Sequence, residues 1–177
     1  PLAGSTFKKV YYDDLLERAV SKFVPADDLV VPYSATSLND AEAIIQTIKI
    51  SENELRKQQV SGFYSDVDLG PPGNIKQDDV EKKEKELDGT KKTGRQEPIY
   101  NLLECHVNLD LEGFEDKDAE LNPTGIKLPY IVTVDEGSKK VLSIRRNYQP
   151  TDPKRNKIQY FVHFKFLPGL GFYGFGL

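Results

Sequence analysis

The strongest constraint on the fold is a two-residue hydrophobic period in the second half of the chain. From Ile99 to Leu111 apolar side chains alternate with polar ones, so that Cys105 and Val107 face one way and His106 the other. A later run puts five apolar side chains on one face, namely Ile158, Tyr160, Val162, Phe164 and Phe166. Because successive side chains of a strand point to opposite faces, this period predicts antiparallel β-strands.

The rest of the pattern predicts an α+β fold, with antiparallel strands, hairpins and a few short helices. A hairpin is expected where Tyr130–Val134 and Lys140–Arg146 flank the turn sequence Asp135-Glu136-Gly137-Ser138. We expect three neighbouring antiparallel strands of this region to form the core sheet. Further strands are expected at residues 29–31 and 44–50, and a capping box of Ser51 and Glu54 predicts a helix start.

Residues 7–13 are expected to form a strand, and residues 14–24 after it are open to two interpretations. Apolar residues between 15 and 24 fall on one helical face, so the periodicity favours a helix that Pro25 would end. The alternative is a hairpin with a strand over 7–13, a turn over 14–17 and a strand over 18–24. The residues alone do not decide between them.

Size and charge exclude several classes of protein. The chain has 177 residues, which suffice for one domain with a core, and no run of 18 apolar residues that could span a bilayer. Its net charge of −4 is unlike that of a nucleic-acid polycation. A single cysteine, Cys105, excludes an intramolecular disulfide and fits a reducing compartment.

Residues 70–97 are highly charged and poor in core residues, so we expect a solvated, mobile excursion there.

Four side chains could together bind a divalent metal. His106, Asp110 and Glu112 share one face of the expected strand, and His163 lies on a strand expected to be its neighbour. The simpler interpretation is that these polar residues occupy the wet face of a half-exposed strand. No metal ligand is therefore assigned.

Two other features resemble known motifs without their context. Residues 169–174 read G-x-G-x-x-G, but no helix or acidic residue can follow within the three remaining residues, which favours a packed turn over a dinucleotide site. Cys105 lies on the apolar side of its strand, as a buried, unreactive thiol would. We therefore expect no catalytic residue and no cofactor.

Charge is distributed unevenly along the second half of the chain. Residues 104–120 are acidic, whereas a basic stretch follows. A patch for assembly or phosphate contact is one interpretation, and neutralisation between adjacent loops is the other. The candidate patch residues are Lys139, Lys140, Arg145, Arg146, Lys154, Arg155 and Lys157.

Several segments resemble the portal proteins of tailed double-stranded-DNA phages, the head-to-tail connectors of short-tailed phages and their prophage relatives. The resemblance is carried by residues 128–134, 141–148 and 160–168 and by the Gly171–Gly176 ending. Weaker echoes occur at 10–13, 25–33 and 54–64, so most of the chain outside 70–97 takes part.

The resemblance implies that the chain is one wing-region fragment of a longer portal subunit, cut before a long helix. Such subunits form rings, twelvefold in virions, at the capsid vertex, and are made in the cytoplasm of the bacterial host. Their partners are other portal subunits, capsid or scaffolding proteins, the packaging terminase, the tail and the passing double-stranded DNA, and no membrane is involved. Portals are not enzymes. The resemblance also favours the hairpin over the helix at 14–24, which we adopt.

Two other functions compete with the portal interpretation. One is a metal-dependent phosphoryl-transfer or nuclease module that uses His106, Asp110, Glu112 and His163. The other is a free-standing nucleic-acid-binding domain that uses the basic residues between 139 and 165.

Overall fold

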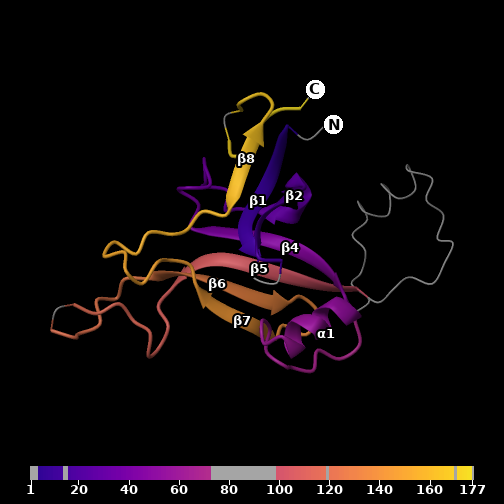
Figure 1. Ribbon diagram of the computed structural model, residues 1–177. Coiled ribbons are helices and arrows are strands. Elements are labelled where there is room, and N and C mark those ends of the chain that lie inside the picture. The colour runs from indigo at the N-terminus through magenta and orange to yellow at the C-terminus, as the bar shows by residue number, and fades with distance from the viewer. Residues whose placement is uncertain (1–3, 14–15, 73–98, 119, 170, 177) are drawn as a thin grey trace.

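The computed structural model describes residues 4–13, 16–72, 99–118, 120–169 and 171–176, which form two antiparallel sheets and an α-helix (Figure 1). The expected α+β class is confirmed. One sheet has the strand order β2-β1-β8 and the other β3-β4-β5-β6-β7. The predicted excursion at 70–97 lies, from residue 73 on, outside the described residues. The bounds are β1 Ser5–Asp13, β2 Arg18–Val24, β3 Leu29–Val30, β4 Ala43–Ser51, α1 Glu52–Val60, β5 Ile99–Leu109, β6 Leu128–Asp135, β7 Val141–Arg146 and β8 Phe161–Lys165.

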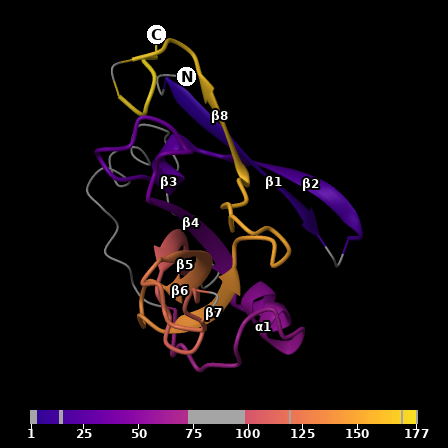
Figure 2. The ribbon, with the colours of Figure 1, turned by 90° about the vertical axis from the view of Figure 1, so that its left-hand side faces the viewer.

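The three-stranded sheet begins with the predicted hairpin. β1 pairs with β2 from Phe7 opposite Val24 to Asp13 opposite Arg18, which confirms the hairpin, and the helix indicated by the periodicity is wrong. In the strand, Phe23 is 64% exposed and Val24 1%, because neighbouring side chains face opposite sides of the sheet. The far end of this hairpin extends away from the five-stranded sheet (Figure 2).

The five-stranded sheet contains the central strands expected from the alternating pattern. β5 pairs with β4 on one side and β6 on the other, and β6 and β7 form the predicted hairpin. The carboxylate of Asp135 closes its turn by accepting a hydrogen bond from the Ser138 amide at 2.6 Å. β8, in contrast, joins the other sheet by pairing with β1.

The helix α1 follows β4 directly, as the capping pattern predicts. The Ser51 hydroxyl accepts a hydrogen bond from the Glu54 amide at 3.3 Å, so one of the unpaired amides of the first turn is satisfied. Leu55 faces the sheet and is 4% exposed. The helix has nine residues, and no helix in the described part of the chain is long and apolar enough to cross a membrane.

The core consists of two apolar clusters. The first joins the inner face of the three-stranded sheet to the start of the other sheet, and includes Phe7, Val24, Leu29, Leu38, Ile44, Phe161 and Phe172. The second lies beneath α1 and contains Leu55, Tyr64, Tyr100, Leu102 and Leu142.

The faces of β5 differ from the expectation. The buried side chains belong to the alternate face of Tyr100, Leu102, Glu104 and His106, whereas Cys105 is only half-buried. The prediction that His106 lies on a wet face is therefore wrong. The physical reason is that β1, β8 and α1 pack against this face. The carboxylate of Glu104 can be buried there because it has charged and polar partners inside the packed layer.

Candidate functional site

The basic residues singled out in the sequence do not gather in one place. Lys139 and Lys140 lie in the turn between β6 and β7, at the end of the sheet near α1, whereas the loop after β7 extends from the opposite end (Figure 1). Arg145 and Arg146 are consecutive in β7 and face opposite sides of the sheet. Lys140 donates a hydrogen bond to the Asp68 carbonyl at 2.5 Å.

Most of these cations have partners of their own within the fold. Arg155 forms an ion pair with Asp116, which belongs to the acidic stretch, so two adjacent loops neutralise each other. Lys157 donates to the carbonyls of Leu38 and Ala41 at 3.3 and 3.0 Å, and burial lowers its pKa. Arg145 stacks on Phe63 at 4.1 Å from the ring centroid. Lys154 is exposed in the loop after β7.

The candidate metal ligands are also separated. His106 is 3% exposed in the five-stranded sheet, with its ring against Phe161, while His163 belongs to the other sheet. Asp110 and Glu112 follow the end of β5. Among the described residues no three His, Cys, Asp or Glu side chains converge as a metal site would require. The expectation that the strands of His106 and His163 are neighbours is wrong, because β8 pairs with β1.

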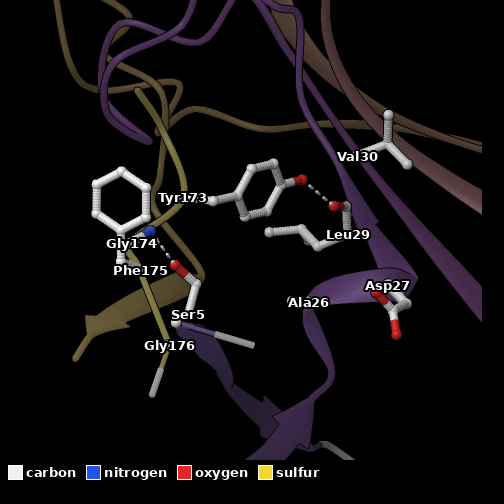
Figure 3. A pocket seen from close by; sticks show the side chains of 10 residues that line it. Ser5, Ala26, Asp27, Leu29, Val30, Tyr173, Gly174, Phe175 and Gly176 are labelled. Atoms are coloured by element: carbon white, nitrogen blue, oxygen red, sulfur yellow. Dashed lines mark hydrogen bonds between the residues drawn. The ribbon is translucent and has the colours of Figure 1, made fainter. Parts of the chain in front are cut away.

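The glycine-rich ending forms a packed turn. Phe172 enters the first core cluster, the Tyr173 hydroxyl donates to the Leu29 carbonyl at 2.7 Å, and the Gly174 amide donates to Ser5 Oγ at 2.8 Å (Figure 3). A Cβ at residue 174 would lie 2.6 Å from the Gly4 carbonyl oxygen, so only glycine permits this backbone crossing.

An open groove of about 600 Å³ lies beside this turn. Its walls are glycine backbone and mainly apolar side chains, with the carboxylate of Asp27 at one side (Figure 3). Among the residues that line the groove, Ser5 is the one nucleophile with a base beside it, since its Oγ lies 2.9 Å from Nε2 of His163.

The Ser5–His163 pair has the atoms of a nucleophile and a base, but its surroundings are structural. Ser5 is 2% exposed and already accepts the Gly174 amide. The His163 ring stacks on both Phe7 and Phe172, at centroid distances of 4.4 and 4.8 Å, and these two rings also contact each other. Burial and the charge of Lys165 lower the pKa of His163, so it is neutral at pH 7. The pair fastens the C-terminal turn to β1.

A buried charged cluster links the two sheets. Glu104 Oε1 accepts hydrogen bonds from Lys9 Nζ at 2.5 Å and from His106 Nε2 at 2.7 Å, and both carboxylate and ammonium are largely buried. Burial by itself would raise the pKa of Glu104, but the His106 hydrogen bond and the charge of Lys9 outweigh it and lower the pKa to about 2. Because an ionised carboxylate only accepts, His106 Nε2 carries the proton. The cluster is fully engaged in joining β1 to β5.

A further feature of the described surface is the outer side of the three-stranded sheet. Residues that are paired across the three strands point to the same side of the sheet. On this outer side, Lys8 of β1 lies between Phe23 of β2 and Val162 of β8. We call the apolar side chains of this side the aromatic face; their exposed fractions are Val10 43%, Tyr12 61%, Phe23 64%, Val162 45%, Phe164 49% and Phe166 60%.

This aromatic face is at the upper end of what the surface of a monomer normally leaves open. With about 200 Å² for an aromatic side chain, the exposed fractions correspond to roughly 600 Å² of accessible surface. The largest apolar patch of a typical monomer is about 300–600 Å², and patches of that size are often functional. The arrangement is suited to contact with another macromolecule.

Sequence reasoning missed both the charged cluster and the aromatic face. The alternation of 158–166 identified the apolar side of β8 correctly, but gave no sign that this side points outward. Lys9 and Glu104 are 95 residues apart, and no local pattern links them.

Comparison with known proteins adds no relative. No protein-family model matches the sequence, and no curated protein matches it significantly.

Proposed function

We propose that this chain is a structural module of a ring-forming phage portal, which works by assembly and not by catalysis. The observation that carries the proposal is the aromatic face, because an apolar sheet side of this size is stabilised when another chain covers it. In a portal the covering chains are neighbouring subunits, capsid or scaffolding proteins, the terminase or the tail.

The resemblance to portal proteins supports the same proposal. Its three main segments, residues 128–134, 141–148 and 160–168, coincide with β6, β7 and β8 and their flanks. These segments thus correspond to complete structural elements, and one of them supplies part of the aromatic face. The proposal places the module in the wing region of a longer subunit, at the capsid vertex of the virion, around the channel for double-stranded DNA.

The proposal is tested on the complete gene product by light scattering coupled to size-exclusion chromatography. A closed ring of about twelve subunits is the expected result. A monomer or dimer that persists at high protein concentration would overturn the proposal. Negative-stain electron microscopy of the same sample distinguishes a closed ring from an irregular aggregate of equal mass.

A further inference from the structure

The strands at the edges of the two sheets differ in how far their free sides are occupied. β3 has two residues, and β7 is partly covered because the Ser65 amide donates a hydrogen bond to the Leu142 carbonyl at 2.8 Å. β8 has five residues, and just past its end the Phe175 amide donates to the Leu167 carbonyl at 2.8 Å. β2 has seven residues, and within the described ranges no backbone hydrogen bond engages its free side.

The alternation of hydrogen bonds in the three-stranded sheet shows which backbone groups of β2 are free. The Val10 amide donates to the Tyr160 carbonyl at 2.8 Å, so the even-numbered residues of β1 direct their backbone groups toward β8. The odd-numbered residues of β1 therefore bond to β2, as Lys9 does to Lys22. The residues of β2 whose N–H and C=O groups point away from the sheet are Ala19, Ser21 and Phe23.

The shape of β2 leaves this edge accessible. The strand contains no proline, its register with β1 runs without a bulge, and five of its seven side chains are exposed. Its hairpin extends away from the five-stranded sheet (Figure 2). At about 3.4 Å per residue the edge is roughly 20 Å long. A regular row of unpaired backbone groups of this length is a template for one more strand.

The side chains of β2 indicate what that strand should carry. Lys22 is paired in register with Lys9, and its ammonium lies 5.5 Å from the centroid of the Tyr11 ring. Lys9 is neutralised by Glu104, whereas Lys22 has no ion pair with any described residue. A residue directly opposite Lys22 on an added strand would lie about 5 Å away, so an acidic side chain there gains a cross-strand ion pair. On the other side of the sheet, the exposed ring of Phe23 favours an apolar neighbour.

We propose that the free edge of β2 binds an extended segment of another polypeptide by strand addition, with an acidic side chain opposite Lys22 and an apolar one opposite Phe23. In this mode of binding, main-chain hydrogen bonds hold the segment and alternate side chains select it. The inference goes beyond the portal proposal and does not depend on ring formation. A second copy of β2 fits less well, because antiparallel pairing about Ser21 would make the two Lys22 side chains diagonal neighbours of like charge.

The test uses a fluorescein-labelled peptide of seven residues, with glutamate placed opposite Lys22 and valine or threonine at the other positions. Fluorescence anisotropy measures its binding to the chain, and saturable binding is expected. Two N-methylated peptides are matched probes. Methyl groups on the residues that flank the glutamate remove the donors that face β2 and should weaken binding roughly tenfold or more. Methyl groups on the alternate set face away from β2 and should change the affinity by less than about twofold.

Variants of the chain test the same edge from the other side. Ser21→Pro removes the N–H at the middle of the free edge and should weaken peptide binding roughly tenfold. It should keep the fold, because this N–H does not bond to β1 and proline is tolerated where the N–H of an edge strand faces solvent. Lys22→Glu should weaken binding of the glutamate peptide and strengthen binding of the same peptide with lysine in its place. Lys139→Glu, in the exposed turn after β6, makes the same change of charge and should leave both affinities unchanged.

Four results would overturn the inference. The first is no saturable binding up to about 1 mM peptide. The second is an equal loss of affinity with the two N-methylated peptides, because backbone pairing would then not be the mode of binding. The third is binding that neither Ser21→Pro nor Lys22→Glu changes. The fourth is a dimer of the parent chain in light scattering that Ser21→Pro abolishes, because a second copy would then occupy the edge. None of these results bears on whether the complete gene product forms a ring, so the portal proposal is decided by its own test.

Discussion

Replacing Glu104 by glutamine tests whether the buried charged cluster stabilises the joint between the two sheets. The substitution keeps the size of the side chain but removes its charge. Lys9, whose side chain is 13% exposed, then retains an ammonium group with no carboxylate beside it. Breaking a buried ion pair by removing one partner typically costs about 3–5 kcal/mol, because the remaining charge stays desolvated.

The pKa of Glu104 gives a separate measure of the same effect. A carboxyl group whose pKa falls from 4.5 to about 2 on folding contributes about 3 kcal/mol of stability at neutral pH. Both arguments therefore lead to a loss of about 3 kcal/mol for Glu104→Gln at pH 7. Equilibrium urea unfolding measures this loss as a lower midpoint at unchanged slope.

The pH dependence follows from the direction of the pKa shift. Because the folded chain holds Glu104 ionised to lower pH than the unfolded chain does, the contribution is fully present well above pH 4.5. It is lost as the pH falls from 4.5 through about 2. The difference between the parent chain and Glu104→Gln should therefore be constant near neutrality, shrink below pH 4.5 and vanish below about pH 2.

Two controls make the result interpretable. Glu112→Gln removes a charge at an exposed position and should change stability by less than about 0.5 kcal/mol. Lys9→Met/Glu104→Gln removes both charges and should be more stable than the sum of the single variants predicts, by about 1–3 kcal/mol. A loss below about 1 kcal/mol for Glu104→Gln, or one that does not change with pH, would refute the reasoning.

Three further outcomes are expected. Ser51→Ala removes the cap of α1 and should cost about 1 kcal/mol in urea unfolding, and an unchanged midpoint would contradict the capping role. Gly174→Ala should detach the C-terminal turn and increase its cleavage by protease. Gly171→Ala is the control and should not increase cleavage, because a Cβ at that position meets no atom within 4 Å. Equal cleavage of the two variants would count against the close backbone crossing. Phe7→Ala should lower the free energy of unfolding by about 3–5 kcal/mol and Phe23→Ala by less than about 1 kcal/mol, because Phe7 is fully buried and Phe23 is 64% exposed. Similar losses for the two variants would mean that the sheet faces are assigned incorrectly.

Local patterns in the sequence determined most of the secondary structure. The two-residue period of 99–111, the turn after Asp135 and the Ser51 cap each depend on residues close in the chain, and each reappears as β5, the β6–β7 hairpin and the start of α1. These features are local because side-chain alternation, turn conformation and capping are set by neighbouring residues.

The tertiary structure decided which side of each strand is buried and which strands are neighbours. Alternation separates the two faces of β5 and β8 but does not say which of them another layer will cover. The polar-looking face of β5 became the interior because Lys9, 95 residues away, neutralises Glu104 there, and the apolar face of β8 became the exterior because Phe7 and Phe172 cover its other side. Such long-range partners depend on how the sheets pack, which no local pattern of residues specifies.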